Sequence, residues 1–233
     1  MAGPLVGYGS STVRREWPAP RRPEFSRTTV PMSFGSNHRA GDPFRRELEV
    51  AYSVFFNRSK RSITLNLQDS GERETLFGLL EGADVFIQSW QPGVADRLGG
   101  VGYEAVHERN PALVYCSISG FGADSEHRDL PGHEALVHAL LGTMGDQAGF
   151  RDGPIFVGVP SASSGAAYLG LIGILSSLYR RKSDGWGGRH VETSLLDGMI
   201  AYVSQSWGYS AHNKQRYRTG GTRFLYQDTP LRG

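Results

Sequence analysis

Short strand patterns alternate with amphipathic helix patterns through the first half of the chain, on short connections. The strands expected from polar/apolar alternation or short apolar runs are residues 62–67, 85–87 and 113–118, and the expected helices are residues 70–80, 94–98 and 103–109. Asp69 and Ser70 are the N-cap candidates of the first helix. This alternation predicts the α/β fold class, with a parallel sheet flanked by helices.

Two further helices are expected toward the C-terminus. The first runs from about Ser161 to Arg181 and is rich in small residues. Apolar and small side chains at helical spacing predict a core face made of Gly165, Leu169, Ile172, Leu175 and Leu178. The segment 191–196 then leads into an apolar helix that continues to about Tyr209.

Composition narrows the possible partners and compartments. The chain of 233 residues has 25 basic and 23 acidic side chains, a net charge of +2, which predicts binding to neither nucleic acid nor a membrane surface. The single cysteine, Cys116, excludes an internal disulfide and is expected in a buried strand. Without an apolar run of membrane-spanning length or an apolar signal core, the sequence predicts a cytoplasmic protein.

Residues 1–40 differ from the rest, because arginine and proline mingle there without helical or strand periodicity. We expect a divergent, extended N-terminal arm.

The stretch 130–142 combines a turn with chemically active side chains. Pro131 and Gly132 break the chain, and the following residues predict a helix whose first turn holds Glu134, with His133 directly before it. Two interpretations of Glu134 are open: a carboxylate that favours a helix start, or a nucleophile or base.

Five segments of the chain together resemble the class III CoA-transferase family, which includes formyl-CoA transferase, carnitine CoA-transferase and α-methylacyl-CoA racemases. They are GDPFR at residues 41–45, NRSKRSITL at 57–65, the segment from ADV to PGVADRLG at 83–99, NPALVYCSISGFG at 110–122, and residues 185–197. The resemblance implies a large Rossmann-like domain, here residues 41–210, and two chains interlocked as a homodimer. Residues 211–233 would begin a linker to a second, small domain that is incomplete in this chain.

The family resemblance also implies a reaction. Family members move coenzyme A between an acyl-CoA and a carboxylic acid, through an enzyme-bound anhydride and thioester and without a metal. Glu134, in Gly132-His133-Glu134, matches the family's catalytic aspartate in a Gly-Tyr-Asp stretch. The extra methylene moves the attacking oxygen by about an ångström, which affects its alignment.

Several residues are candidates for binding coenzyme A. Arg97 matches a family arginine near the nucleotide phosphates, and Ser89 stands where formyl-CoA transferase has an asparagine. The other candidates are the basic side chains Arg45, Lys60 and Arg61 and the turn glycines Gly120 and Gly122, which follow a strand end. A solvated basic edge is the alternative for each of the three basic residues.

Three other functions stay open. A racemase would use His133 as an acid or base with a second carboxylate further along the chain, but residues 157–163 contain none. His133 is thus a second catalytic candidate, and the alternative for it is a turn histidine that helps hold Glu134. The chain could instead be a non-catalytic remnant or subunit of such an enzyme. General nucleotide binding would rest on the α/β pattern alone, since no Gly-x-Gly-x-x-Gly turn is present.

Overall fold

The computed structural model describes residues 10–13, 30–33, 63–145 and 154–212. Its centre is a parallel sheet in the order β4-β5-β6, formed by Val85–Gln88, Val114–Ser119 and His190–Ser194. Val85 pairs with Val114, and Cys116 pairs with Val191. The mixed α/β fold with a parallel sheet, predicted from the alternating pattern, is confirmed.

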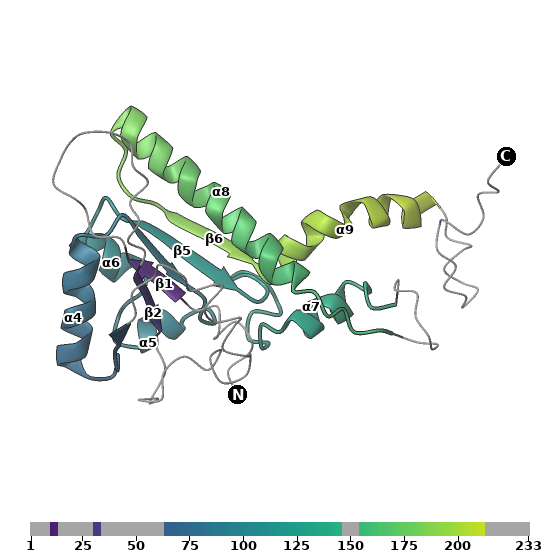
Figure 1. The fold of residues 1–233 in the computed structure, drawn as a ribbon, viewed down its shortest axis with the longest axis horizontal. Coiled ribbons are helices and arrows are strands. Elements are labelled where there is room, and N and C mark those ends of the chain that lie inside the picture. Colours follow the sequence, from purple (N-terminus) through teal and green to yellow (C-terminus); the bar gives the residue numbers. More distant parts are fainter. Residues whose placement is uncertain (1–9, 14–29, 34–62, 146–153, 213–233) are drawn as a thin grey trace.

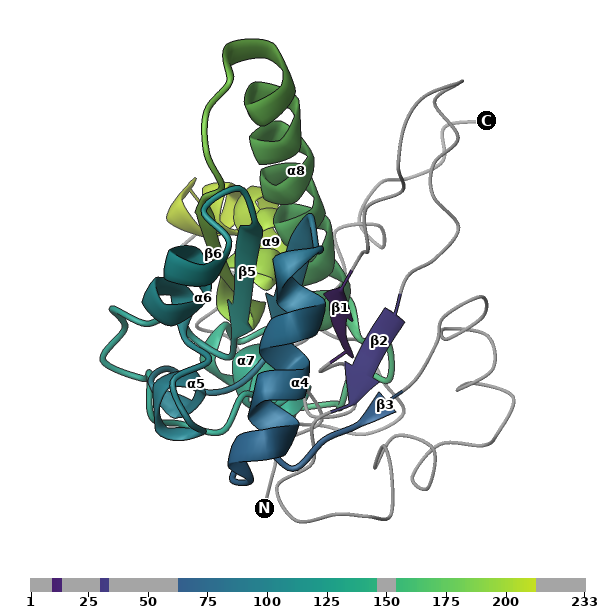
Figure 2. The same ribbon diagram turned by 90° about the vertical axis from the view of Figure 1, so that its left-hand side faces the viewer.

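Helices α4 (Ser70–Glu81) and α6 (Tyr103–Arg109) cover one face of this sheet, as Figure 2 shows. Asp69 is the N-cap of α4, and its side chain accepts a hydrogen bond of 2.9 Å from the backbone N–H of Glu72. The apolar side of the two helices packs on the strands through a cluster that includes Leu76, Leu80, Phe86, Val106 and Tyr115. Both helices were predicted, because each has its own local N-terminal and periodic signals.

The opposite face of the sheet is covered by α8 (Ser161–Asp184), which runs alongside β5 and β6 (Figure 1). Gly170 lies over Cys116, and Gly173 lies against the side chain of Val191, so the helix axis approaches the strands closely. Cys116 is fully buried in β5, as predicted, and burial raises the pKa of its thiol to about 12.

Beyond the carboxyl ends of the strands, α8 crosses α9 (Leu195–His212) at two glycines. A Cβ on Gly165 would lie 2.4 Å from the carbonyl oxygen of Gly198, so only hydrogen is tolerated on that side of the crossing. An apolar cluster here includes Phe121, Val137, Ala166, Leu195 and Met199 and joins α8 and α9 to the helix that carries Glu134.

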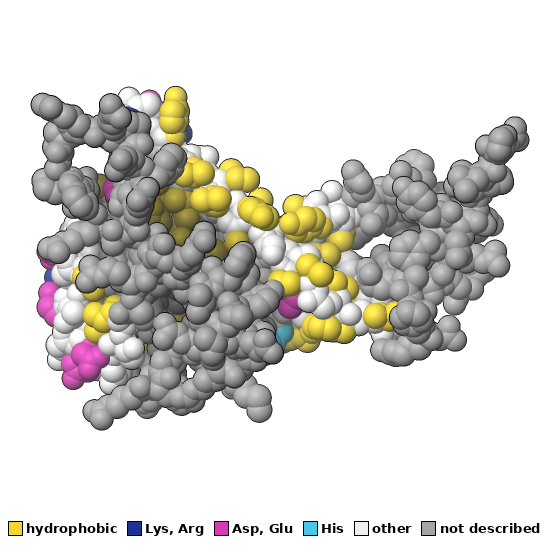
Figure 3. All heavy atoms as spheres, in the orientation of Figure 1, with side chains coloured by type: hydrophobic (Ala, Val, Ile, Leu, Met, Phe, Trp, Pro, Cys, Tyr) yellow, Lys and Arg dark blue, Asp and Glu magenta, His cyan; other side chains and the backbone are white. Residues whose placement is uncertain are grey.

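The predicted core face of α8 was wrong in part. Ile172 and Leu175 are 61% and 50% exposed, whereas Ala162, Gly165, Ala166, Gly170 and Ile174 form the buried side. Apolar residues occur all round this helix, so their spacing did not identify the side that faces the sheet. In Figure 3 the exposed apolar side chains form a band along α8.

By length and composition, α8 is the one helix in the described part of the chain that could cross a membrane, with a mean hydropathy of 1.3. A core helix of a soluble protein passes the same test, and α8 packs one long side on β5, β6 and α9. Composition therefore does not assign this helix to a membrane.

Three short strands form a second sheet in the order β1-β2-β3: Ser10–Val13, Val30–Ser33 and Ile63–Thr64. β1 and β2 are antiparallel, whereas β2 and β3 are parallel. The strand predicted at 62–67 is thus shorter than expected. Two of these strands fall within the expected N-terminal arm, most of which lies outside the described residues, and the division into domains stays a prediction.

Candidate functional site

The helix that carries Glu134, α7 (Glu134–Leu140), begins beside the carboxyl end of β5. A Cβ on Gly120, the first residue after β5, would lie 2.5 Å from the Cα of Gly132, so the two backbones touch. The carbonyl oxygen of Gly120 also accepts a hydrogen bond of 3.1 Å from the backbone N–H of Leu196 in α9. Glu134 therefore lies at the edge of the sheet where open α/β proteins bind their ligands.

The carboxylate of Glu134 is held by the first turn of α8, and its side chain is 12% exposed. Oε1 accepts a hydrogen bond of 2.6 Å from the backbone N–H of Ala162. Oε2 accepts one of 3.1 Å from the backbone N–H of Ser163 and one of 2.6 Å from its hydroxyl. Each carboxylate oxygen thus has a defined position and at least one donor.

Glu134 acts as the N-terminal cap of a helix to which it does not belong. The N-cap residue of α8 is Pro160, which makes no side-chain capping bond. The first amides of a helix have no intrahelical acceptor, and their partial positive charge attracts an anion. The carboxylate supplies both the acceptors and the negative charge, so neither of the two interpretations of Glu134 anticipated its partner helix.

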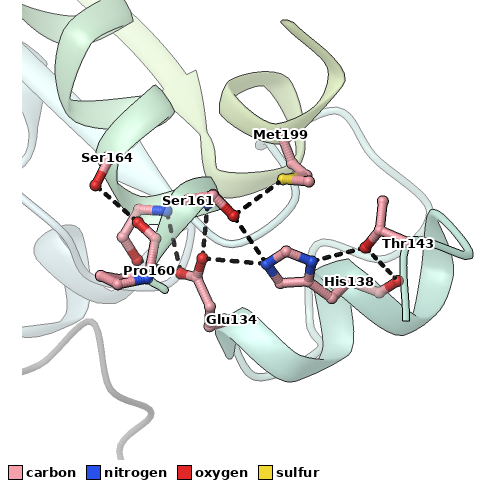
Figure 4. Close-up of polar contacts among 9 residues, drawn as sticks. Glu134, His138, Thr143, Pro160, Ser161, Ser164 and Met199 are labelled. Carbon is pink, nitrogen blue, oxygen red and sulfur yellow. Dashed lines mark hydrogen bonds and ion pairs between the residues drawn. The ribbon is translucent and has the colours of Figure 1, made fainter. Parts of the chain in front are cut away.

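His138, one turn after Glu134, is fully buried behind the carboxylate (Figure 4). Its Nε2 lies 3.4 Å from Glu134 Oε1 and 3.1 Å from the hydroxyl of Ser161. Its Nδ1 lies 2.7 Å from the hydroxyl of Thr143. Because a carboxylate only accepts hydrogen bonds, a proton on Nε2 complements Glu134. The Thr143 hydroxyl also donates to the carbonyl oxygen of His138, at 3.2 Å.

The other residues predicted for this region lie around the same edge. His133 is the N-cap of α7, and no hydrogen bond or ion pair between His133 and Glu134 is present in the described part of the chain. Ser89 follows the carboxyl end of β4. Gly122 has a φ of 90° in the turn after β5, where its N–H donates to the hydroxyl of Ser119.

Arg97 lies in α5 (Val94–Arg97) and is exposed. A side-chain amide connects the turn before this helix to the segment that precedes Glu134: Gln91 Nε2 donates to the carbonyl oxygen of Leu130, at 3.4 Å. The described residues show no direct contact between Arg97 and Glu134. The remaining basic candidates, Arg45, Lys60 and Arg61, lie outside the described residues.

Sequence reasoning missed the three residues that contact the Glu134 carboxylate. Ala162 and Ser163 carry no sequence signal of their own, since a run of small residues suggests only packing. His138 could have been found, because it stands four residues after Glu134 and so shares its face of the helix. Among the described residues, no group of three or more His, Cys, Asp or Glu side chains could hold a metal ion.

The chain is thus an α/β protein with a largely buried carboxylate at the carboxyl edge of its parallel sheet. The sequence model of CoA-transferase family III matches residues 33–228, so the chain belongs to that family, as the sequence motifs indicated. It is 37% identical over 213 residues to acetyl-CoA:oxalate CoA-transferase of Acetobacter aceti, covering 86% of this chain and 54% of that relative. It is 33% identical to succinyl-CoA:mesaconate CoA-transferase of Haloarcula marismortui, covering 75% of this chain and 46% of that one.

A solved structure of a CaiB/BaiF family protein from Brucella suis has the same fold. The TM-score is 0.70 at 28% sequence identity, with 79% of this chain and 50% of that chain covered. The chain therefore spans about half the length of these relatives.

Proposed function

We propose that this chain carries the catalytic carboxylate of a CoA-transferase that moves coenzyme A from an acyl-CoA to a carboxylic acid. The observation that carries the proposal is the Glu134 carboxylate, aligned by Ala162 and Ser163 at the carboxyl edge of the sheet. Family membership supports the reaction class, and the geometry supports Glu134 as the group that performs it.

In this reaction Glu134 is first a nucleophile and then an electrophile. One of its oxygens attacks the acyl-CoA carbonyl, the carbon–sulfur bond breaks, and coenzyme A leaves as a thiolate. The thiolate attacks the Glu134 carbonyl of the resulting anhydride, which releases the first acid as its carboxylate. The second acid then attacks the glutamyl-CoA thioester, and the expelled thiolate takes the new acyl group, which restores Glu134.

Coenzyme A would lie along the same edge of the sheet. We assign its phosphates to Arg97, with Ser89 and the turn glycines Gly120 and Gly122 beside the remainder of the molecule. The basic residues Arg45, Lys60 and Arg61 are further phosphate contacts in this proposal. Strand ends and backbone turns without side chains leave room for a long, thin ligand.

The arrangement around Glu134 favours transfer over racemisation. A racemase needs a second acid or base on the far side of the substrate, whereas the start of α8 offers the carboxylate only amides and a hydroxyl. His138, 3.4 Å from Glu134, is fully buried behind the carboxylate and not across a substrate from it. The described residues also show no hydrogen bond or ion pair between His133 and Glu134.

The substrate class and the assembly complete the proposal. Oxalate and mesaconate appear in the names of relatives, so small dicarboxylic acids are the first acceptors to test. We also propose an interlocked homodimer in the cytoplasm. The exposed apolar band of α8 is consistent with a polypeptide cover in such a dimer.

A covalent adduct tests the proposal. The protein is incubated with acetyl-CoA, treated with acid, digested and analysed by mass spectrometry. We expect coenzyme A on the peptide that contains Glu134, none in Glu134→Gln, and an unchanged amount in Glu126→Gln, whose side chain is 87% exposed in a nearby loop. Hydroxylamine should remove the adduct, since it cleaves thioesters.

The competing function is a non-catalytic remnant or subunit. The observation in its favour is that the chain spans about half the length of its relatives. A remnant would acquire no adduct with acetyl-CoA, succinyl-CoA or formyl-CoA. That result would exclude the transferase proposal for the chain on its own.

A further inference from the structure

The hydroxyl of Ser163 has an unusual partner for a serine in a helix. Serine hydroxyls within helices commonly bond the carbonyl four residues earlier, as Ser164 does with Pro160 at 2.7 Å and Ser177 does with Gly173 at 2.8 Å. Ser163 instead directs its hydroxyl to Glu134 Oε2, at 2.6 Å. Its single proton is thus committed to the atom on which charge changes during the proposed reaction.

The charge on the Glu134 oxygens changes in a defined way. At rest one negative charge is shared between Oε1 and Oε2. In the anhydride and the thioester the remaining carbonyl oxygen is neutral and a weak acceptor. When a thiolate or an incoming carboxylate attacks the Glu134 carbonyl carbon, that oxygen becomes a full oxyanion, which is the strongest acceptor of the three states.

On the basis of the proposed function, we propose that Ser163 is a further catalytic residue. Its hydroxyl donates a hydrogen bond to the oxyanion formed at the Glu134 carbonyl carbon. It accelerates the two steps in which Glu134 is the electrophile: thiolate attack on the anhydride, and acid attack on the thioester. It does not accelerate the step in which Glu134 is the nucleophile, since there it stabilises the starting carboxylate.

The surroundings of Ser163 fit this role. Its backbone N–H and hydroxyl reach the same oxygen, and the adjacent N–H of Ala162 reaches the other, so three donors are already oriented before reaction. The close crossing of Gly165 and Gly198 fixes the start of α8 against α9. Donors that need no rearrangement stabilise developing charge most effectively.

The proposal predicts an unusual pair of changes in Ser163→Ala. Discharge of the glutamyl-CoA thioester should slow by about 10- to 100-fold, the range for loss of one hydrogen bond to a charged group. At the same time the fraction of protein carrying coenzyme A at equilibrium should rise, because the variant loses a donor to the free carboxylate but little in the neutral thioester. Ser163→Ala should thus discharge the thioester more slowly and carry coenzyme A on a larger fraction of its molecules.

The experiment measures both quantities with defined probes. Full-length protein is loaded with acetyl-CoA, freed from excess and mixed with acetate, and the adduct on Glu134 is followed by mass spectrometry. A second series holds acetyl-CoA and acetate at fixed ratios until the adduct level is constant. Ser164→Ala is the matched control, since its hydroxyl bonds Pro160 and not Glu134, and Ser163→Thr should restore the discharge rate by restoring the hydroxyl.

The outcomes separate the two proposals. Slow discharge with raised occupancy in Ser163→Ala, and neither change in Ser164→Ala, would support the role of Ser163. Two results would overturn this role while leaving Glu134 as the nucleophile. One is discharge in Ser163→Ala as fast as in the wild-type protein, and the other is a loss of both the discharge rate and the fraction of protein carrying coenzyme A. If the wild-type protein acquires no adduct, both proposals fail.

Discussion

Replacing Glu134 with alanine should destabilise the protein, independently of any effect on activity. The change leaves the backbone N–H groups of Ala162 and Ser163 and the hydroxyl of Ser163 without their acceptor. A hydrogen bond to a charged group contributes about 1.5–3 kcal/mol, and an anion at a helix N-terminus adds about 0.3–1 kcal/mol. Partial hydration of the freed groups and relief from burying the charge offset part of this sum.

We therefore expect the free energy of unfolding to fall by about 2–4 kcal/mol, with a decrease in Tm of about 4–16 °C for a chain of this size. Urea unfolding followed by circular dichroism measures the change, provided that the slope of the transition is unaltered. Glu126→Ala is the control, because its exposed side chain should contribute less than about 0.5 kcal/mol. If Glu134→Ala proves as stable as this control, the capping of α8 by Glu134 is refuted.

Three further predictions concern the surroundings of the site. His138→Ala should lower the free energy of unfolding by about 2–4 kcal/mol in the same urea assay, since it empties a buried, hydrogen-bonded position. Gly165→Ala should destabilise by at least about 1–3 kcal/mol through collision with Gly198, whereas Gly78→Ala, in open space within α4, should stabilise by about 0.5–1 kcal/mol; equal effects would contradict the helix crossing. Since burial raises the pKa of Cys116 to about 12 from 9.0, this thiol should resist alkylation at pH 8 until urea unfolds the chain, and its contribution to stability is present below pH 9 and lost as the pH rises further.

Local signals account for the parts of the fold that were predicted well. Asp69 caps α4 through a bond to a residue three positions away, and the apolar run of β5 is complete within six residues. Such features depend only on residues that are close in sequence, so they can be predicted from one sequence. The strands at 10–13 and 30–33 pair with each other although residues 14–29 separate them in the sequence. No local pattern in the surrounding proline-rich and arginine-rich sequence indicated either strand.

The candidate site was predicted only at its centre. Glu134 could be located because a turn and a family motif surround it, but its donors come from a helix that starts 27 residues later. Which helix turn faces a carboxylate is set by tertiary packing, and here that packing depends on glycine contacts such as Gly120 with Gly132. The exposed side of α8 was mistaken for the same reason, since Ile172 and Ile174 are equally apolar and only one of them meets the sheet.

The contact between Gly165 and Gly198 has a practical consequence for protein engineering. No side chain separates the two backbones, so a substitution there cannot be absorbed by a change of rotamer and would shift the first turn of α8 as a rigid unit. Attempts to alter the acyl selectivity of the proposed transferase should therefore leave both glycines in place and vary the loops instead. If Gly165 and Gly198 are randomised, we expect most variants to be destabilised and inactive in the proposed reaction, so few of them would reveal a changed substrate preference.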